Sequence, residues 1–174
     1  MPGINLIEKT ERHANIAKWV SHNKTGRQEK IRMMNSPSTF VSLIPAWKTL
    51  RDAARAVRKN AYAPYSKYAV GAALLTASGN IYSGCNVENA SYGLTICAER
   101  SAVCSAVSAG ETQLIAICIS LTGIPVPCGT CRQFLYEFNS DMQVLLDNLE
   151  PGEQPPECVL LSDLLPRAFH LLKT

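Results

Sequence analysis

The stretch CAERSAVCSAVSAGETQLIAICISLTGIPVPCGTCRQF, residues 97–134, decides the fold class of this chain. Residues 97–109 have the composition of a helix, and Gly110 is a natural helix stop. Residues 114–121 are an apolar run of strand length, typical of a central strand that is buried on both faces. A second helical segment, residues 128–138, follows a loop that contains prolines. Helix and buried strand in alternation predict an α/β layered domain.

The segments on either side supply another helix and the remaining strands. Before this stretch, apolar residues at helical spacing predict an amphipathic helix from Pro45 to near Asn60. Two strands then form a hairpin around the turn Ser78-Gly79-Asn80. The expected strands span residues 68–76, 81–87, 142–146 and 159–161, the last of them just before residues 163–165. A hairpin followed by strand–helix alternation makes the sheet mixed.

The composition is that of a globular protein with one main domain. The chain has 174 residues, of which 47% are hydrophobic and 18% charged, and this excludes collagen-like, coiled-coil and wholly disordered classes. The longest apolar run is too short to span a membrane, and the first residues hold no apolar signal region. We therefore expect a cytoplasmic protein whose seven cysteines are reduced.

Charge divides the chain in two. Residues 1–35 hold seven Lys or Arg against three Asp or Glu, whereas residues 36–174 hold ten against eleven. We predict a basic, flexible N-terminal extension over residues 1–35 and the main domain over residues 36–174. Two alternatives remain for the extension, namely a translation start at Met34 or a nucleic-acid-binding tail. The near-neutral main domain argues against a nucleic-acid partner, because such binding relies on clustered cations.

Three cysteines occupy the starts of the two predicted helices. Cys97 opens one helix, and Cys128 and Cys131 open the other as a CxxC pair. The positive end of a helix dipole favours the thiolate form, and three thiolates suit Zn²⁺ with a fourth position left open. Glu99, in the first turn after Cys97, is placed to move protons to and from a water that the metal activates.

Two other interpretations of these residues fit less well. A CxxC pair in a reduced cytosol can be a redox pair, but that leaves Cys97 and Glu99 without a role. A structural zinc site needs a fourth protein ligand, for which Cys85 is a candidate. Glu99 has no purpose in such a closed site.

The cysteine motifs resemble the paired zinc signatures of the cytidine deaminase family. The match covers about residues 47–170 and includes further motifs in the family's order. The motifs are Ala63-Pro64-Tyr65-Ser66, Val70-Gly71-Ala72-Ala73-Leu74, Asn86-Val87-Glu88-Asn89-Ala90, Cys97-Ala98-Glu99, Pro127-Cys128-Gly129-Thr130-Cys131 and Leu164-Leu165-Pro166. A cysteine rather than a histidine as the first ligand is similar to the short, homotetrameric nucleoside deaminases.

The resemblance implies a fold and an activity. The fold is a three-layer α/β/α sandwich with a mixed five-stranded sheet, in a homotetramer with shared active sites and one Zn²⁺ per subunit. The activity is hydrolytic deamination of cytidine and 2′-deoxycytidine to uridine and 2′-deoxyuridine plus ammonia, through a zinc-bound hydroxide, in pyrimidine salvage. The partner is thus a small-molecule nucleoside, with no membrane and no nucleic acid. A modified cytidine is the alternative substrate, and Cys97 in place of histidine argues against polynucleotide editing.

The resemblance also assigns roles to individual residues. Glu99 is the catalytic proton shuttle, and Arg100 donates hydrogen bonds to the ligand sulfurs. The zinc ligands are Cys97, Cys128 and Cys131. The substrate-binding residues are Asn86 and Glu88 on the ribose, the Ala98 backbone on the base, Tyr68 where the family commonly has Phe, and Tyr92 and Phe169 reaching a neighbouring subunit's pocket.

The remaining cysteines and histidines are predicted to have structural roles. Buried packing is expected for Cys85, Cys104, Cys118 and Cys158, and surface or packing positions are expected for His13, His22 and His170. Arg132 follows a ligand and could cap or pair locally. Small residues between positions 97 and 110 fit either core packing or a subunit interface.

Overall fold

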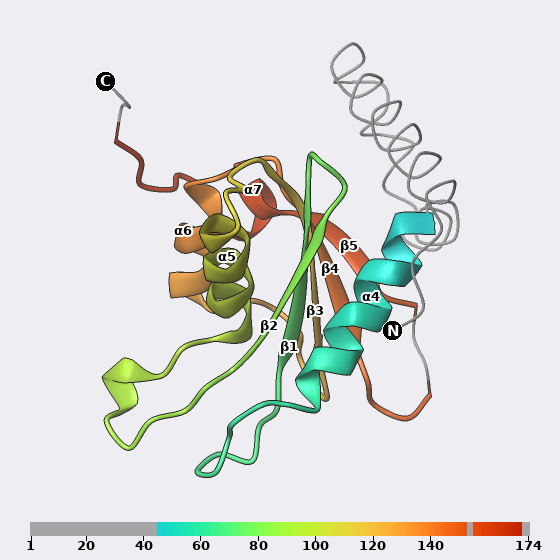
Figure 1. Ribbon diagram of the computed structural model, residues 1–174, viewed down its shortest axis with the longest axis vertical. Helices are drawn as coiled ribbons and strands as arrows, with labels where there is room; N and C mark the ends of the chain where they lie inside the picture. Colours follow the sequence, from blue (N-terminus) through green and yellow to red (C-terminus); the bar gives the residue numbers. More distant parts are fainter. Residues whose placement is uncertain (1–44, 153–154, 172–174) are drawn as a thin grey trace.

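The computed structural model describes residues 45–152 and 155–171, so the predictions for residues 1–35 lie outside it. The described chain forms three layers, with a five-stranded sheet between helices, which confirms the predicted α/β/α sandwich (Figure 1). None of the described helices has both the length and the apolar character of a membrane span. In chain order the elements are α4 (Pro45–Arg58), β1 (Gly71–Thr76), β2 (Ile81–Cys85), the 3₁₀ helix η1 (Tyr92–Leu94), α5 (Ala98–Ser108), β3 (Leu114–Leu121), α6 (Gly129–Tyr136), β4 (Gln143–Asn148), β5 (Glu157–Leu160) and α7 (Leu161–Leu164).

The sheet is mixed, as predicted, with the strand order β2-β1-β3-β4-β5. β1 pairs antiparallel with β2 and with β3, β3 runs parallel to β4, and β5 is antiparallel to β4. The crossover between the two parallel strands contains α6. On one side the sheet is covered by α4, and on the other by α5, α6 and α7 (Figure 1).

Three chain segments meet at one edge of this sheet. Because β2 and β3 both run antiparallel to β1, their carboxyl ends lie beside the amino end of β1. In the sheet register, Gly71 is flanked by Cys85 on one side and by Ser120 on the other. The chain after β2 leads into α5, and the chain after β3 leads into α6. The starts of both helices therefore lie at the same edge, where they can form one site.

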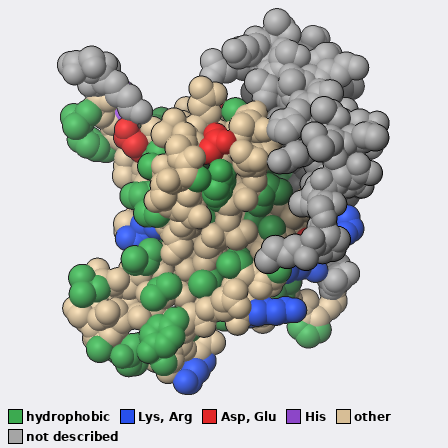
Figure 2. Space-filling model, in the orientation of Figure 1, with side chains coloured by type: hydrophobic (Ala, Val, Ile, Leu, Met, Phe, Trp, Pro, Cys, Tyr) green, Lys and Arg blue, Asp and Glu red, His purple; other side chains and the backbone are tan. Residues whose placement is uncertain are grey.

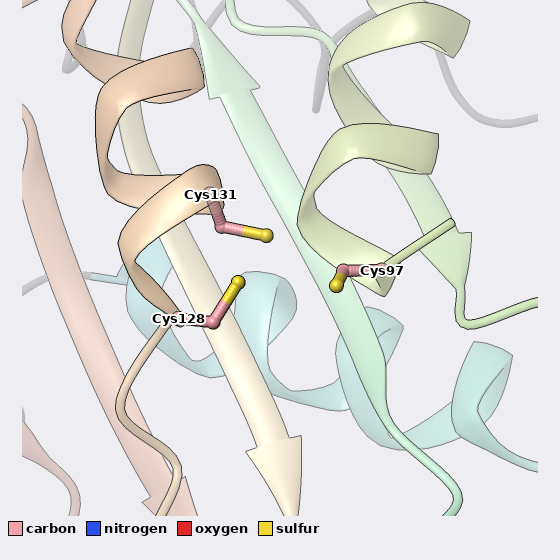
Figure 3. Close-up of side chains that lie close together, drawn as sticks. All are labelled: Cys97, Cys128 and Cys131. Carbon is pink, nitrogen blue, oxygen red and sulfur yellow. The ribbon is translucent and has the colours of Figure 1, made fainter. Parts of the chain in front are cut away.

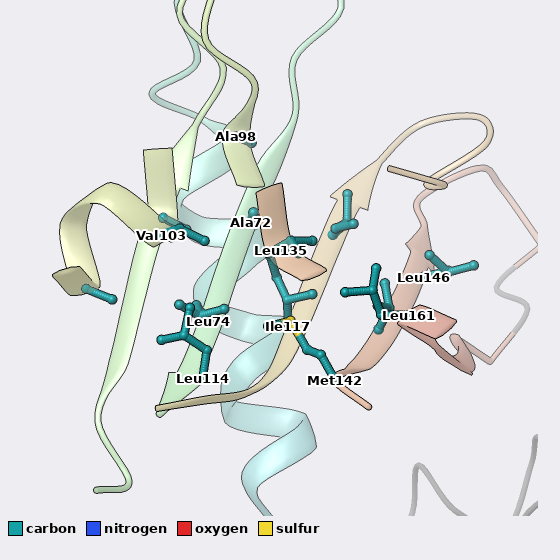
Figure 4. Close-up of a cluster of buried hydrophobic side chains, with 14 of the residues drawn as sticks. Ala72, Leu74, Ala98, Val103, Leu114, Ile117, Leu135, Met142, Leu146 and Leu161 are labelled. Atoms are coloured by element: carbon teal, nitrogen blue, oxygen red, sulfur yellow. The ribbon is translucent and has the colours of Figure 1, made fainter. Parts of the chain in front are cut away.

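Each face of the sheet has its own hydrophobic core. On one face, Trp47, Leu50 and Ala54 of α4 pack against β1, β3 and β4. On the other face, residues of α5, α6 and α7 pack against side chains that include Leu74 and Ile117 (Figure 4). β3 is buried at seven of its eight residues, which is why its sequence is a continuous apolar run rather than an alternation.

The main departure from the predicted strands is at residues 68–70. The strand predicted over residues 68–76 begins only at Gly71, because the backbone of residues 68–70 is bonded mainly by side chains, with one backbone bond from the Asn86 amide to the Val70 carbonyl. β2 ends two residues earlier than predicted, and Val87 instead forms isolated bridges with Tyr62 and Ile96. The other predicted helices and strands match the structure to within two residues.

Gly84 allows α5 to lie directly on β2. A Cβ atom at this position would be 2.3 Å from the backbone nitrogen of Ala102. We expect Gly84→Ala to lower the free energy of unfolding by about 2 kcal/mol, because the helix has to move away from the strand. Urea unfolding followed by circular dichroism measures the difference. The control is Gly93→Ala, where a Cβ would meet nothing within 4 Å, and equal stability of the two variants would contradict the prediction.

Candidate metal centre

The three cysteines predicted as ligands meet between the first turns of α5 and α6. Cys97 is the residue before α5, Cys128 is the residue before α6, and Cys131 lies in the first turn of α6. Their sulfur atoms all lie within 4.8 Å of one another, and the side chains point into a common space (Figure 3). Cys85 is not part of this group. Three converging thiolates fit a tetrahedral zinc centre that keeps one position for a non-protein ligand.

The surroundings of the cluster favour a negative charge on Cys97. Its sulfur accepts hydrogen bonds from the Cys131 thiol and from Arg100, and these lower the pKa of Cys97 to about 5. Cys131 is the donor in this pair and is buried, so its own pKa is raised. The surroundings of Cys97 thus favour the thiolate, which is the form of cysteine that binds a metal.

Glu99 lies buried in the first turn of α5, next to the sulfurs. Burial raises the pKa of its carboxyl group, and the negative charge of Cys97 raises it further. The neighbouring Cys131 thiol and Arg100 partly offset this rise. A carboxyl group whose pKa moves toward neutrality can both accept and release a proton.

Arg100 connects the cysteine cluster to the loop before α5. Its Nη2 donates to the Thr95 carbonyl oxygen at 2.9 Å and to the Cys97 sulfur at 3.8 Å. The hydrogen bond and the charge of the sulfur raise the pKa of the Arg100 guanidinium. Hydrogen bonds from a cation withdraw negative charge from a sulfur ligand and so tune the metal that it binds.

Side chains also fix the backbone of the segment before β1, residues 68–70. The Asn86 side chain accepts from the Val70 amide and donates to the Tyr68 carbonyl, each at 2.8 Å. The Ser66 hydroxyl accepts from the Tyr68 amide at 3.0 Å, and Arg58 donates to the Ala69 carbonyl at 2.8 Å. Three side chains thus hold four backbone groups of the segment that carries Tyr68.

Tyr68 and Glu88 border the same edge of the sheet. Partial burial raises the pKa of the Tyr68 hydroxyl, and the charge of Glu99 contributes to the rise, so these two side chains lie within electrostatic reach of each other. Glu88 accepts from the Ser66 hydroxyl and from the amides of Tyr65 and Ser66, at 2.9 and 3.2 Å for the amides. These bonds lower the pKa of Glu88, which is therefore a carboxylate at neutral pH.

The site lies within a region that matches a known family. The profile of the cytidine and deoxycytidylate deaminase zinc-binding region matches residues 47–146, which include all three cysteines and Glu99. The chain belongs to the cytidine deaminase family. It is accordingly an enzyme, and zinc is the metal that the matching region of the family binds.

Individual members of the family are similar to this deaminase over most of their length. A cytidine deaminase of Mycobacterium tuberculosis is 45% identical over 127 residues, which are 72% of this chain and 90% of that protein. A cytidine deaminase of Halalkalibacterium halodurans is 48% identical over 115 residues, 64% of this chain and 85% of that protein. The crystal structure of the cytidine deaminase from Burkholderia pseudomallei has a TM-score of 0.66 at 45% identity, over 70% of this chain and 98% of that one.

The other residues of this deaminase that are predicted to bind substrate differ in how far they are buried. Ala98 is buried at the start of α5. Tyr92 in η1 and Phe169 after α7 are 80% and 69% exposed, so neither is buried in the site of its own chain. The prediction that they reach the pocket of a neighbouring subunit stays a prediction.

One prediction for the other cysteines is wrong, since Cys104 is exposed. It lies on the face of α5 that is turned away from the core, whereas the buried residues of α5 at helical spacing include Ala98, Ala102 and Ala106. These alanines confirm core packing for that face of the helix. Burial is confirmed for Cys118 and is partial for Cys85 and Cys158. His170 is exposed, and His13 and His22 lie outside the described residues.

The sequence did not reveal what two arginines of this deaminase contact. Arg58 bonds the carbonyl of Ala69 and the hydroxyl of Thr122, and Arg132 bonds the carbonyls of Pro127 and Leu164. Backbone carbonyls in distant segments leave no pattern in a sequence. The position of Arg132 directly after the CxxC pair was the one available signal.

Proposed function

We propose that this deaminase hydrolyses the 4-amino group of cytidine and of 2′-deoxycytidine. Water is consumed, and uridine or 2′-deoxyuridine and ammonia are released. The observation that carries the proposal is the buried Glu99 carboxyl group, with its raised pKa, beside three converging sulfurs. The similarity to proteins named cytidine deaminase supports the choice of base.

In this proposal the chain holds the metal and moves the protons. Cys97, Cys128 and Cys131 are the zinc ligands, and bound zinc supplies the Lewis acidity that makes water a nucleophile at neutral pH. Glu99 moves the first proton of the attacking water to N3 of the base, and then moves the second proton, from the new hydroxyl on C4, to the amino group, which leaves as ammonia. The raised pKa of Glu99 suits both directions of this transfer.

The residues at the edge of the sheet are proposed to bind the nucleoside. Glu88 and Asn86 bond the ribose hydroxyls, the Ala98 backbone bonds the base, and Tyr68 packs on the substrate. The Asn86 side-chain amide uses one N–H and one oxygen lone pair on residues 68–70. Its second N–H and second lone pair remain to bond the ribose. The Glu88 carboxylate favours a free nucleoside, because its charge repels a phosphate on the sugar.

The proposal includes a role in cytoplasmic pyrimidine salvage. It also includes assembly into a homotetramer in which subunits share active sites. Hydrophobic side chains gather over the loops around η1, at the lower left of Figure 2. The exposed ones in this region include Tyr62, Val87, Tyr92, Leu94 and Ile96. Exposed apolar groups in such number mark an interaction surface. Light scattering of the purified protein tests the assembly, and a monomer would contradict it.

The proposed reaction is tested by the fall in ultraviolet absorbance when cytidine becomes uridine. The panel holds cytidine, 2′-deoxycytidine, a 5-modified cytidine and cytidine 5′-monophosphate, with zinc counted by atomic absorption. We expect turnover of the two free nucleosides and a much lower kcat/KM for the monophosphate. A protein with one zinc per chain that turns over neither nucleoside would contradict the proposed substrate.

Replacing Arg100 tests how the site tunes its sulfurs. We expect Arg100→Ala to keep zinc but to lower kcat by about tenfold to a hundredfold, because Cys97 loses the hydrogen bond that withdraws its charge. Arg100→Lys keeps the charge, but its ammonium lies on a flexible stem and holds the two bonds of Nη2 less rigidly, so an intermediate kcat is expected. A kcat in zinc-loaded Arg100→Ala equal to that of the wild type would contradict this role.

A further inference from the structure

Arg132 connects the loop that carries Cys128 to the last helix of the described chain. It lies in α6, directly after Cys131. Its Nε donates to the carbonyl oxygen of Pro127 at 2.7 Å, and its Nη1 donates to the carbonyl oxygen of Leu164 at 2.9 Å. One guanidinium thus joins the residue before Cys128 to the end of α7.

Of the two cysteines on α6, Cys128 is the one that needs such support. Cys131 is buried within the helix, whereas Cys128 is exposed and precedes the first helical residue. The Cys128 side chain makes no capping hydrogen bond to the start of α6, and Cys128 has an extended backbone conformation. The path of the chain into Cys128 therefore depends on what holds Pro127. In the structure, Arg132 donates the hydrogen bond that holds the Pro127 carbonyl.

We propose that Arg132 is a positioning residue that keeps Cys128 in place for metal binding. It acts by holding the Pro127 carbonyl against a second fixed point, the end of α7. The inference rests on the zinc site of the proposed function. A planar guanidinium can donate to two carbonyls at once, whereas a lysine ammonium at the same place is a single point charge on a flexible stem.

The next residue along α6 provides a matched control. Gln133 donates through Nε2 to the carbonyl oxygen of Phe169 at 2.8 Å. Like Arg132, it bonds a backbone carbonyl of the segment that ends the described chain. Its bond does not involve the loop before Cys128. Gln133→Ala thus removes a contact to the C-terminal segment and leaves the Pro127 contact intact.

The experiment measures how fast the zinc-loaded protein gives up its metal to an excess of a chromophoric chelator. Wild type, Arg132→Ala, Arg132→Lys and Gln133→Ala are compared, with circular dichroism to verify that each is folded. Loss of a group that orients a ligand typically costs 10- to 100-fold in metal affinity, and we expect Arg132→Ala to release zinc faster by about that factor. Arg132→Lys is expected to be intermediate, and Gln133→Ala to stay within about twofold of the wild type.

A spectrum gives a second measurement that does not depend on activity. Co²⁺ in the same site absorbs in the visible range according to its thiolate number and geometry, so Arg132→Ala is expected to alter these bands and Gln133→Ala to preserve them. Release from Arg132→Ala at the wild-type rate, or equal acceleration in Arg132→Ala and Gln133→Ala, would overturn the inference. If Arg132→Ala does not fold, wild-type release from Arg132→Lys overturns it.

The outcomes also separate this inference from the function on which it rests. A wild-type protein that binds zinc but does not deaminate nucleosides refutes the proposed function, and the release rates still decide the role of Arg132. A wild-type protein that binds no zinc overturns both. Full deaminase activity in wild type together with wild-type zinc release from Arg132→Ala overturns the positioning role alone.

Discussion

Glu99→Ala is expected to lower kcat for cytidine by about 10³- to 10⁴-fold while the protein keeps its zinc. General acid–base catalysis is worth up to about this factor, and Glu99 is the acid–base group proposed for both the attacking water and the departing amino group. Removing the side chain leaves the three cysteine sulfurs in place, since they come from other residues. The measurement is the initial rate of absorbance change, with zinc counted in the same samples.

Glu99→Gln is the matched control for this prediction. The amide has nearly the size of the carboxyl group and keeps its hydrogen-bonding capacity, but it does not exchange a proton at neutral pH. A loss in Glu99→Gln as large as that in Glu99→Ala assigns the effect to proton transfer. A kcat within tenfold of the wild type in zinc-loaded Glu99→Ala would contradict the catalytic role.

The second large effect is expected on the opposite face of the sheet, where Arg55→Ala leaves Asp147 without its cation. Arg55 makes two bonds to the Asp147 carboxylate, each of 2.7 Å, and the Ser120 hydroxyl donates a third at 2.6 Å. Asp147 is only 1% exposed while Arg55 is in place, so its charge is compensated by protein groups rather than by bulk water. Breaking a buried ion pair from one side typically costs 3–5 kcal/mol. Because Arg55 itself is partly exposed, we expect a loss of about 3 kcal/mol in the free energy of unfolding.

The same helix contains the control for this prediction. Lys48 and Asp52 form an ion pair at 2.8 Å, but both side chains are exposed. Lys48→Ala is therefore expected to change stability by less than about 0.5 kcal/mol. Urea denaturation of both zinc-loaded variants gives the comparison. Equal changes in the two variants would show that the buried position of Asp147 is of no consequence.

The fold could be predicted from the sequence because local patterns and layer order agree. The apolar run of β3 matches its bounds in the structure, since a strand buried on both faces has no reason to alternate. The hairpin turn at Gly79 has a positive φ of 86°, a conformation that glycine adopts without strain. The predicted start of β1 was wrong because Asn86 and Arg58, which are distant in sequence, bond the backbone that a strand would have used.

The convergence of the three cysteines could be predicted for a different reason. The cysteines lie at the starts of two helices that follow two strands ending at the same edge, so the order of helices and strands brings Cys97 near Cys128 and Cys131. The contacts of Arg132 and the ion pair of Asp147 could not be predicted. They depend on which carbonyl or carboxylate tertiary packing brings within reach, and no local pattern encodes this. To predict that Cys104 is exposed, one would have had to know which face of α5 packs on the core.

The side-chain support of residues 68–70 has a consequence for the energetics of recognition. A loop that borders a site usually loses conformational freedom when a ligand arrives, and part of the binding energy is offset by that ordering. Here Asn86, Ser66 and Arg58 restrict the backbone around Tyr68 when the chain folds. The conformational entropy of this segment is thus lost once, during folding, and a ligand that contacts Tyr68 meets a preorganised surface.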